Sequence, residues 1–424
     1  MNARPLLTLL AIALPACTGC STPRSMDAAG DADATAIFDG ATPRRDAAID
    51  ARDAGADAIP PPPWLDGSLT LPMRENRWPP NQFSTCAGRV ALAPLHPRIN
   101  YDAHWWNGTI YYSHTGTPVR VVPGSGLIQG LSDSQFQLGG MVAISGEQLI
   151  YAASWRGAHA EAVVAFDRVE QGAVGRTLWH RERVNTQSSG GFWDLTATPS
   201  LIAFSWQDSE ESGDWSTRVY AMNPDGTDLR VLSPRNVPQS GDVRASGDRV
   251  VFRAGGQVYL WQRGDAEARP IDPTNRSQWH PWIDGDHVVW IDQRDSPRGS
   301  IYSPDNPEVY YKNLRTGEVR RITHDPDTSP VFQSDVTIAG DWIAWTDLRH
   351  ASNPNPDSPL GDRIAIYGFH IPTQTEYALV NEPSCKTDVP LLLGGRLFVA
   401  GYPLTGGSGS MYEFPLPTIA PRDQ

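Results

Sequence analysis

Basic residues are scarce in this sequence of 424 residues: 35 lysines and arginines stand against 48 aspartates and glutamates, and the formal net charge is −13. This imbalance argues against an extended surface for nucleic acid or anionic lipid headgroups. Cysteine is rarer still, with four residues. The sequence has no Gly-x-Ser-x-Gly motif and no His-Glu-x-x-His motif, so the usual signatures of a serine hydrolase elbow and of a zinc peptidase are missing.

Glycine, proline and tryptophan are abundant, at 38, 37 and 15 residues. This mixture predicts many short strands joined by turns. A chain of this length is long enough for one large all-β domain or for two ordinary domains.

Residues 1–20 have the pattern of an export signal: Arg4 precedes the apolar stretch PLLTLLAIALPA, which is too short to span a bilayer as a stable helix. The stretch ends in LPACTGCS, which resembles a bacterial lipoprotein signal, whose cysteine is acylated. Cys20 is the preferred lipidation site and Cys17 remains open; simple secretion after cleavage nearby is the alternative. The resemblance implies an outer-membrane lipoprotein, on the periplasmic or the surface face, held by its lipid alone.

Residues 21–63 are rich in Ala and Asp, nearly free of aromatic side chains and closed by four prolines. Such a segment cannot bury enough apolar surface to offset its ordering entropy. We therefore predict a disordered tether at 21–63 and a folded domain at 64–424.

A repeat runs through the folded domain. The segment DGDHVVWIDQRD (284–295) returns 55 positions later as AGDWIAWTDLRH (339–350). Each copy has an approach, a tight turn and an apolar strand, which predicts a β-hairpin. We count seven copies, at 102–112, 141–151, 194–204, 242–252, 280–290, 335–345 and 389–399.

A second hairpin follows the first in most copies, as in EVYYKNLRTGEVRRIT (308–323). Two hairpins give four antiparallel strands, and units of roughly 40–55 residues with four strands are typical of propeller blades, as in WD40 repeats. The sequence thus predicts an all-β propeller of seven blades, with six as the alternative. We expect residues 86–94 to add an outer strand to the last blade and to bring Cys86 against Cys385 in a disulfide.

The pattern Gly-Asp-x-Ile/Val-x-Trp-x-Asp-x-Arg, followed by Tyr-x-x-Asn-Leu-x-Thr-Gly, resembles the repeats of TolB-like propellers over about residues 135–415. The resemblance implies a propeller in the cell envelope. A linker stands where TolB has a small α/β domain, so no role in the Tol system is implied.

Polar residues recur five positions before the turns. Because innermost strands line a propeller channel, this position predicts a polar ring at the channel mouth for water, a ligand or an oxygen-bound divalent cation. The alternative is structural, with each side chain bonded to a backbone amide of the next blade. The candidates are Asp102, Asp194, Asp242, His280, Asp335 and Asp388, with Met141 in the remaining copy.

Two further sets of side chains stand out. Trp105, Trp106, Trp279 and Trp282 lie near the turns and are candidates to stack on a ligand, whereas Trp290 and Trp345 are predicted to be core residues. Asp292 with Arg294, and Asp347 with Arg349, share a strand face two residues apart, which predicts structural ion pairs.

These observations favour a propeller that binds a protein or glycan partner of the envelope, without catalytic residues, without a resident cofactor or metal, and as a monomer. We therefore expect that the chain is not an enzyme. The alternative function is a glycan-active enzyme, a polysaccharide lyase or a glycosidase, that uses the central channel.

Overall fold

The computed structural model describes residues 69–419 with gaps, the longest being 77–84, 96–102, 132–140, 183–190, 209–215, 296–306, 325–332, 350–363 and 404–408. The predicted signal and tether, with Cys17 and Cys20, lie outside the described residues, as does Asp102. Among the described residues no helix is present that is long and apolar enough to cross a membrane.

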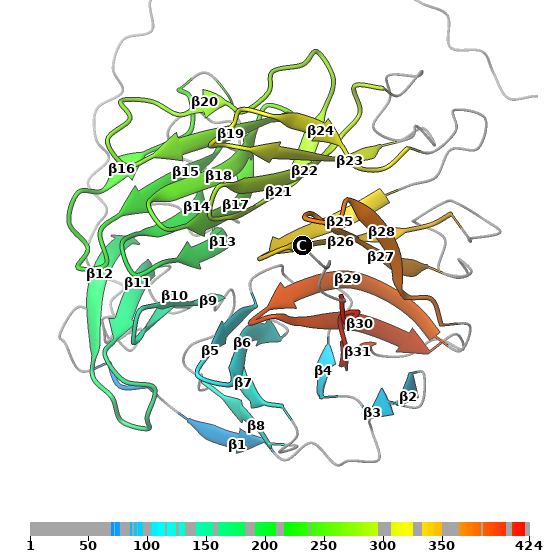
Figure 1. Cartoon of the computed structure of the whole chain (residues 1–424). Helices are drawn as coiled ribbons and strands as arrows, with labels where there is room; N and C mark the ends of the chain where they lie inside the picture. Colours follow the sequence, from blue (N-terminus) through cyan, green and yellow to red (C-terminus); the bar gives the residue numbers. More distant parts are fainter. Residues whose placement is uncertain are drawn as a thin grey trace, which may run out of the picture. The chain divides into compact units, whose positions relative to one another are not determined.

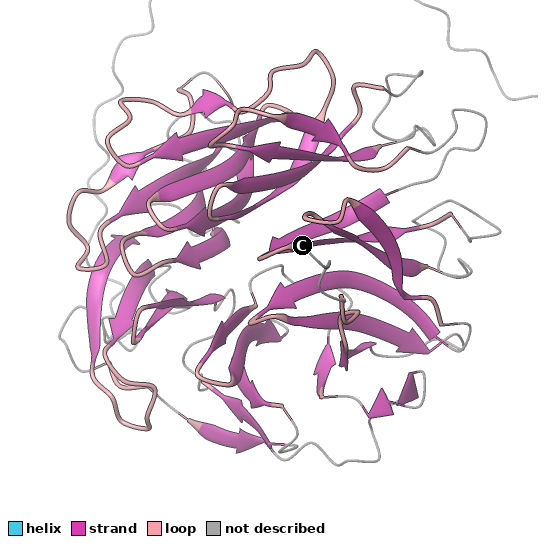
Figure 2. Cartoon of the chain, in the orientation of Figure 1, coloured by secondary structure: helices cyan, strands magenta, loops and turns pink. Residues whose placement is uncertain are grey.

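The described strands form seven antiparallel sheets of four or five strands and one small hairpin. Figures 1 and 2 show the sheets arranged as blades around a central axis, joined by loops. From blade one to blade seven, the innermost strand of each blade contacts that of the next, and blades seven and one share an apolar cluster. The predicted seven-bladed β-propeller is therefore confirmed, and the six-bladed alternative is wrong.

The strands of each blade are given from the innermost outwards. Blade one contains β5 (His104–Trp106), β6 (Thr109–His114), β7 (Thr117–Val122) and β8 (Leu127–Gly130), and blade two contains β9 (Met141–Ser145), β10 (Gln148–Trp155), β11 (Ala160–Phe166) and β12 (Gly175–Glu182). Blade three contains β13 (Phe192–Ala197), β14 (Ile202–Asp208), β15 (Ser216–Met222) and β16 (Arg230–Val231), and blade four contains β17 (Ser240–Ser246), β18 (Arg249–Ala254), β19 (Gln257–Gln262) and β20 (Arg269–Pro270).

Blades five to seven contain β21 (Gln278–Asp284), β22 (His287–Asp292), β23 (Glu308–Asn313) and β24 (Val319–Arg321); β25 (Gln333–Ala339), β26 (Trp342–Asp347), β27 (Ala365–His370) and β28 (Thr375–Val380); and β29 (Cys385–Leu393), β30 (Arg396–Pro403), β31 (Gly409–Phe414) and β4 (Ala93–Leu95). The hairpins expected around 308–323 and the equivalent segments are the third and fourth strands of their blades.

Segments that precede the first blade close the ring. β4 pairs with β31, so the outer strand of blade seven comes from the amino-terminal side, as predicted, although it spans 93–95 instead of 86–94. β1 (Arg74–Asn76) pairs with β8 and extends blade one. Thr70 bridges to Val174 on the outer edge of blade two. These additions cover edges that would otherwise expose unpaired backbone groups.

Apolar clusters lie between neighbouring blades. Between blades five and six, for example, Val289, Ile291 and Val309 pack with Ile343 and Trp345. Between blades seven and one, Phe398 and Met411 pack with Ile110 and Tyr112. Because each blade shows an apolar face to both neighbours, the core is distributed around the ring and no blade could bury its faces alone.

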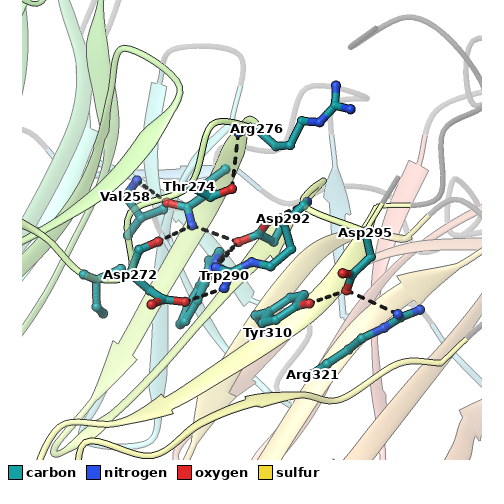
Figure 3. A network of polar contacts seen from close by, with 12 residues as sticks. Val258, Asp272, Thr274, Arg276, Trp290, Asp292, Asp295, Tyr310 and Arg321 are labelled. Carbon is teal, nitrogen blue, oxygen red and sulfur yellow. Dashed lines mark hydrogen bonds and ion pairs between the residues drawn. The ribbon is translucent and has the colours of Figure 1, made fainter. Parts of the chain in front are cut away.

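Polar networks reinforce these interfaces at the repeated Asp and Arg (Figure 3). Asp292 is fully buried and accepts hydrogen bonds from Trp290 Nε1 at 2.8 Å, Gln278 Nε2 at 2.8 Å and an Arg294 terminal nitrogen at 2.6 Å. Arg294 also reaches Asp272, which follows β20 of blade four, at 2.5 Å. The charge-assisted pair predicted from the sequence is thus confirmed, and it ties two blades together.

Candidate functional site

The innermost strands have a bulge near the position that recurs five residues before the turn. Register shifts occur between Gly241 and Arg244, between Trp279 and Trp282, and between Ser334 and Thr337. Asp242, His280 and Asp335 sit in these bulges with φ of 55°, 48° and 51°. Such left-handed conformations in non-glycine residues cost free energy, and at Asp242 and His280 the backbone amide meets an aspartate of the preceding blade.

The repeated polar side chains join into a continuous arc across blades three to seven. Asp194 Oδ2 accepts from the backbone nitrogen of Asp242 at 3.0 Å, and Asp242 Oδ2 accepts from that of His280 at 3.4 Å. Further round, His280 Nδ1 lies 3.6 Å from Asp335 Oδ1, and Asp335 is hydrogen-bonded to Asp388. The predicted residues other than Asp102 are therefore brought together, and two of them make the interblade amide bonds of the structural alternative.

The polar arc consists of Asp194, Asp242, His280, Asp335 and Asp388, and burial shifts the pKa of several of its members. Burial raises the pKa of Asp194, helped by the charge of Asp242. Burial, together with the charge of Asp388 and their hydrogen bond, raises the pKa of Asp335 well above its usual range. Burial raises the pKa of Asp388 as well, whereas the shared hydrogen bond lowers it, so Asp335 is the donor of this bond. Two carboxylates in contact cannot both ionise at low cost.

A cavity of about 530 Å³ lies beside the arc, lined by the innermost strands of six of the seven blades. His104, Thr196, Arg244 and Trp282 line it from the position three residues before the turn. Ser246 and Asp284 line it one residue before the turn. The channel is thus layered, with the polar arc at one level and the cavity walls between it and the turns.

Arg244 connects the polar arc to the cavity. One of its terminal nitrogens donates to the Val243 carbonyl at 2.6 Å and lies 3.9 Å from Asp194 Oδ1. Its guanidinium lies 4.7 Å from the ring centre of Trp282, which is a cation–π contact. The cation therefore stays inside the channel, on one face of an indole that also lines the cavity.

His104 presents an unpaired lone pair on the same wall. Burial and the charge of Arg244 lower the pKa of His104 to about 4, so the ring is neutral near pH 7. A hydrogen bond to the Leu195 backbone holds the ring, while Nε2 is buried without a hydrogen-bond partner among the residues that the structure describes. Such an atom costs free energy unless something in the cavity bonds it.

The four tryptophan candidates separate into two groups. Trp105 and Trp282 line the cavity; the Trp105 indole stacks on Phe398 with ring centres 5.9 Å apart. Trp106 instead packs against Tyr111, and Trp279 packs into the cluster between blades five and six. Only the first pair is placed where it can touch a channel ligand.

His104, Arg244 and Asp284 were missed by the sequence analysis. The signal was present, because His104, Arg244 and Trp282 occupy the same repeat position, three residues before the turn. A propeller brings equivalent positions to one level of the channel. A large polar or aromatic side chain at this position therefore predicts a residue that lines the channel.

No group of three or more His, Cys, Asp or Glu side chains is arranged to hold a metal ion in the described part of the chain. A divalent cation at the polar ring, the possibility that the sequence left open, stays untested.

Seven blades around a polar channel define the chain as a β-propeller. No protein-family model matches the sequence, and no curated protein matches it. Among solved structures, an oligogalacturonate lyase in complex with manganese is similar at a TM-score of 0.51 and 13% identity, covering 82% of this chain and 98% of that one. An acylaminoacyl peptidase in complex with Z-Gly-Gly-Phe-chloromethyl ketone is similar at a TM-score of 0.50 and 12% identity, covering 76% of this chain and 51% of that one.

This chain thus matches about half the length of the peptidase. A putative TolB from Agrobacterium tumefaciens is also similar, at a TM-score of 0.35 and 12% identity, covering 65% of this chain and 90% of that one, which is too little to argue from. The expectation that the chain is not an enzyme is corrected, because solved proteins of the same fold are enzymes. At these identities the likeness shows the fold alone, so function must be argued from this chain's residues.

Proposed function

We propose that this propeller binds a glycan of the bacterial cell envelope in its central channel. The observation that carries the proposal is the cavity of about 530 Å³, which six blades line together and which contains two indoles, a guanidinium and a neutral imidazole. Its volume is in the usual range for small-molecule sites. An apolar wall with a few convergent polar groups is the arrangement that such sites share.

Glycans fit this chemistry better than other partners. Sugar rings offer C–H faces to indoles and hydroxyls to polar groups, and the cavity has both Trp105 and Trp282 beside Arg244, Ser246 and Asp284. A channel cavity lined by strands of six blades suits the end or a short segment of a glycan chain. A peptide is the other partner class suggested by the sequence, and the test includes it.

The test is a calorimetric titration of the purified protein with maltotriose, chitotriose, trigalacturonate and the tripeptide Gly-Gly-Phe, after a glycan array has widened the panel. Trigalacturonate is included because a solved propeller of this fold is an oligogalacturonate lyase. Trp282→Ala should weaken binding of the retained sugar at least tenfold. Trp279→Ala, which removes an indole packed elsewhere, should leave the affinity unchanged; binding of the peptide alone would refute the glycan proposal.

The protein's location is part of the same proposal. A lipid on Cys20, or on Cys17, would anchor the chain at the outer membrane, and residues 21–63 would tether the propeller to it. Labelling with a fatty-acid analogue and mass spectrometry of the mature amino terminus test this anchor. We also propose the Cys86–Cys385 disulfide, supported by the contact between β2 (Thr85–Cys86) and β30, the partner strand of β29, in which Cys385 is buried. Non-reducing peptide mapping tests it.

A second candidate function is catalysis on the bound glycan. The favouring observation is the Asp335–Asp388 pair, in which the two carboxyls share a hydrogen bond and both have a raised pKa, with His280 Nδ1 3.6 Å from Asp335. Acid and base side by side are the groups that general acid–base chemistry requires. Chromatography of the retained glycan after incubation with wild type, Asp335→Asn and Asp388→Asn would show products from the wild type only.

A further inference from the structure

We infer that Nε2 of His104 accepts a hydrogen bond from a hydroxyl of the ligand, so that His104 determines the orientation of the sugar in the cavity. This inference rests on the proposed function, since it names a contact within the same cavity. His104 belongs to β5, the short innermost strand of blade one, and it lines the cavity together with Trp105.

The state of the imidazole leaves one chemical role for Nε2. A ring that is neutral carries one N–H and one lone pair. The bond to the Leu195 backbone raises the His104 pKa, which is the effect of a ring N–H that donates to a carbonyl. The N–H is thus on the other nitrogen, Nδ1, and Nε2 is a hydrogen-bond acceptor.

The surroundings of His104 oppose its protonation. Burial and the nearby Arg244 charge both disfavour an imidazolium, so Nε2 stays an acceptor instead of becoming a second donor. The Arg244 charge is itself paired with the polar arc, since a terminal nitrogen of Arg244 lies 3.9 Å from Asp194. The Leu195 backbone of blade three therefore holds the ring, so the acceptor does not depend on the ligand.

A hydroxyl fits this wall because it donates and accepts at once. It can donate to Nε2 of His104 while its oxygen faces the positive field of Arg244, and a neighbouring hydroxyl can bond Ser246 or Asp284, which line the same cavity. A ligand without a donor would leave Nε2 unpaired, which is the arrangement that gives strong discrimination between otherwise similar molecules.

The experiment compares His104→Phe with His104→Gln. Phe keeps the size of the ring and removes both nitrogens, whereas Gln supplies an amide N–H for Leu195 and an oxygen acceptor for the ligand. Affinity for the sugar retained in the panel of maltotriose, chitotriose and trigalacturonate is measured by calorimetry for each folded variant. We expect at least a tenfold loss for His104→Phe and less than a threefold loss for His104→Gln, which corresponds to about 1.4 kcal/mol or more for the first change.

A spectroscopic readout separates a ligand contact from packing. In protein with ¹⁵N-labelled histidine, the resonance of the unprotonated Nε2 of His104 should move when that sugar is added. Equal affinity of wild type and His104→Phe would overturn the inference, and so would equal losses in both variants with an unmoved resonance. If Trp282→Ala still weakens sugar binding in either case, the proposed function stands although the inference about His104 is wrong. If the wild type binds none of the three sugars, the proposed function itself is wrong.

Discussion

Trp290 donates a hydrogen bond of 2.8 Å from its indole Nε1 to Oδ2 of Asp292, two residues along the same strand. The next copy of the repeat does the same, with 2.9 Å between Trp345 Nε1 and Asp347 Oδ2. Both carboxylates are fully buried, and each accepts further bonds from the arginine that follows it. The repeated letters Trp-x-Asp-x-Arg therefore encode one buried bonding unit, used twice.

Replacing Asp292 by Ala should destabilise the propeller by about 3–5 kcal/mol, because it leaves two buried N–H donors without this acceptor, at roughly 1–3 kcal/mol each, and removes the buried partner of Arg294. Arg294 would keep Asp272, but Trp290 and Gln278 would lose their acceptor. Asp347→Ala should cost a similar amount. Chemical denaturation followed by tryptophan fluorescence measures both.

Asp228 supplies a matched control. It pairs with Arg230 at 3.0 Å, also two residues apart, but both side chains are nearly half exposed. Exposed pairs contribute little, so Asp228→Asn, which removes the charge and tolerates the left-handed backbone at this position, should change the free energy of unfolding by less than about 1 kcal/mol. A loss at Asp292 as small as that at Asp228 would show that the buried unit does not stabilise the fold.

Most of the fold follows from the sequence. The seven turns, the strands that follow them and the second hairpins are local patterns that recur, and recurrence selects a ring of blades. The pairing of an amino-terminal strand, β4, with the last blade also follows from the number of strands that the sequence pattern predicts. The additions at β1 and Thr70 do not, because short edge pairings carry too few side chains to leave a periodic signal.

The sequence predicted the polar arc of the site but not most of the side chains that line the cavity. The polar arc could be found because Asp194, Asp242, His280 and Asp335 stand at one repeat position. Their backbone conformation could not, since nothing in the residue types indicates a bulge at Asp or His. The cavity side chains differ in type from blade to blade, so they form a site only through the ring, and a search for repeated residues passes over them.

Asp335→Asn should stabilise the protein at neutral and alkaline pH. The folded pKa of Asp335 is raised, so the folded state holds a proton that the unfolded chain releases. Stability is therefore lost as pH rises from about 4 through the raised pKa. Asn removes that dependence and can still donate an N–H to Asp388, while tolerating the left-handed backbone at this position.

Thermal unfolding of wild type and Asp335→Asn at pH 4 and pH 8 measures the effect. The melting temperatures should be close at pH 4, and the variant should be the more stable at pH 8. A variant that is less stable than wild type at pH 8 would contradict a protonated Asp335.

Gly394→Ala should disturb the cavity wall. Gly394 has a φ of +57°, and a Cβ placed there would lie 2.6 Å from the Trp105 indole. Gly340 has a φ of +56°, but a Cβ there would meet nothing within 4 Å. Both changes carry backbone strain of about 1 kcal/mol, and Gly394→Ala adds a steric cost of roughly 1–3 kcal/mol.

The comparison of the two alanine variants isolates the steric term. Gly394→Ala should lower the melting temperature more than Gly340→Ala and should weaken sugar binding, because Trp105 has to move. Equal effects of the two variants on stability and affinity would mean that Trp105 is not held against blade seven as the structure shows.

Sugar binding by channel-filling variants tests the location of the ligand most directly. Ala197 and Ala339 line the cavity from blades three and six, and Leu229 is an exposed residue outside it. Calorimetry should show at least a tenfold loss of affinity for Ala197→Trp and for Ala339→Trp, and none for Leu229→Trp, with all three variants folded by circular dichroism. Folded channel-filling variants that bind the sugar as tightly as wild type would contradict a ligand site in the central channel.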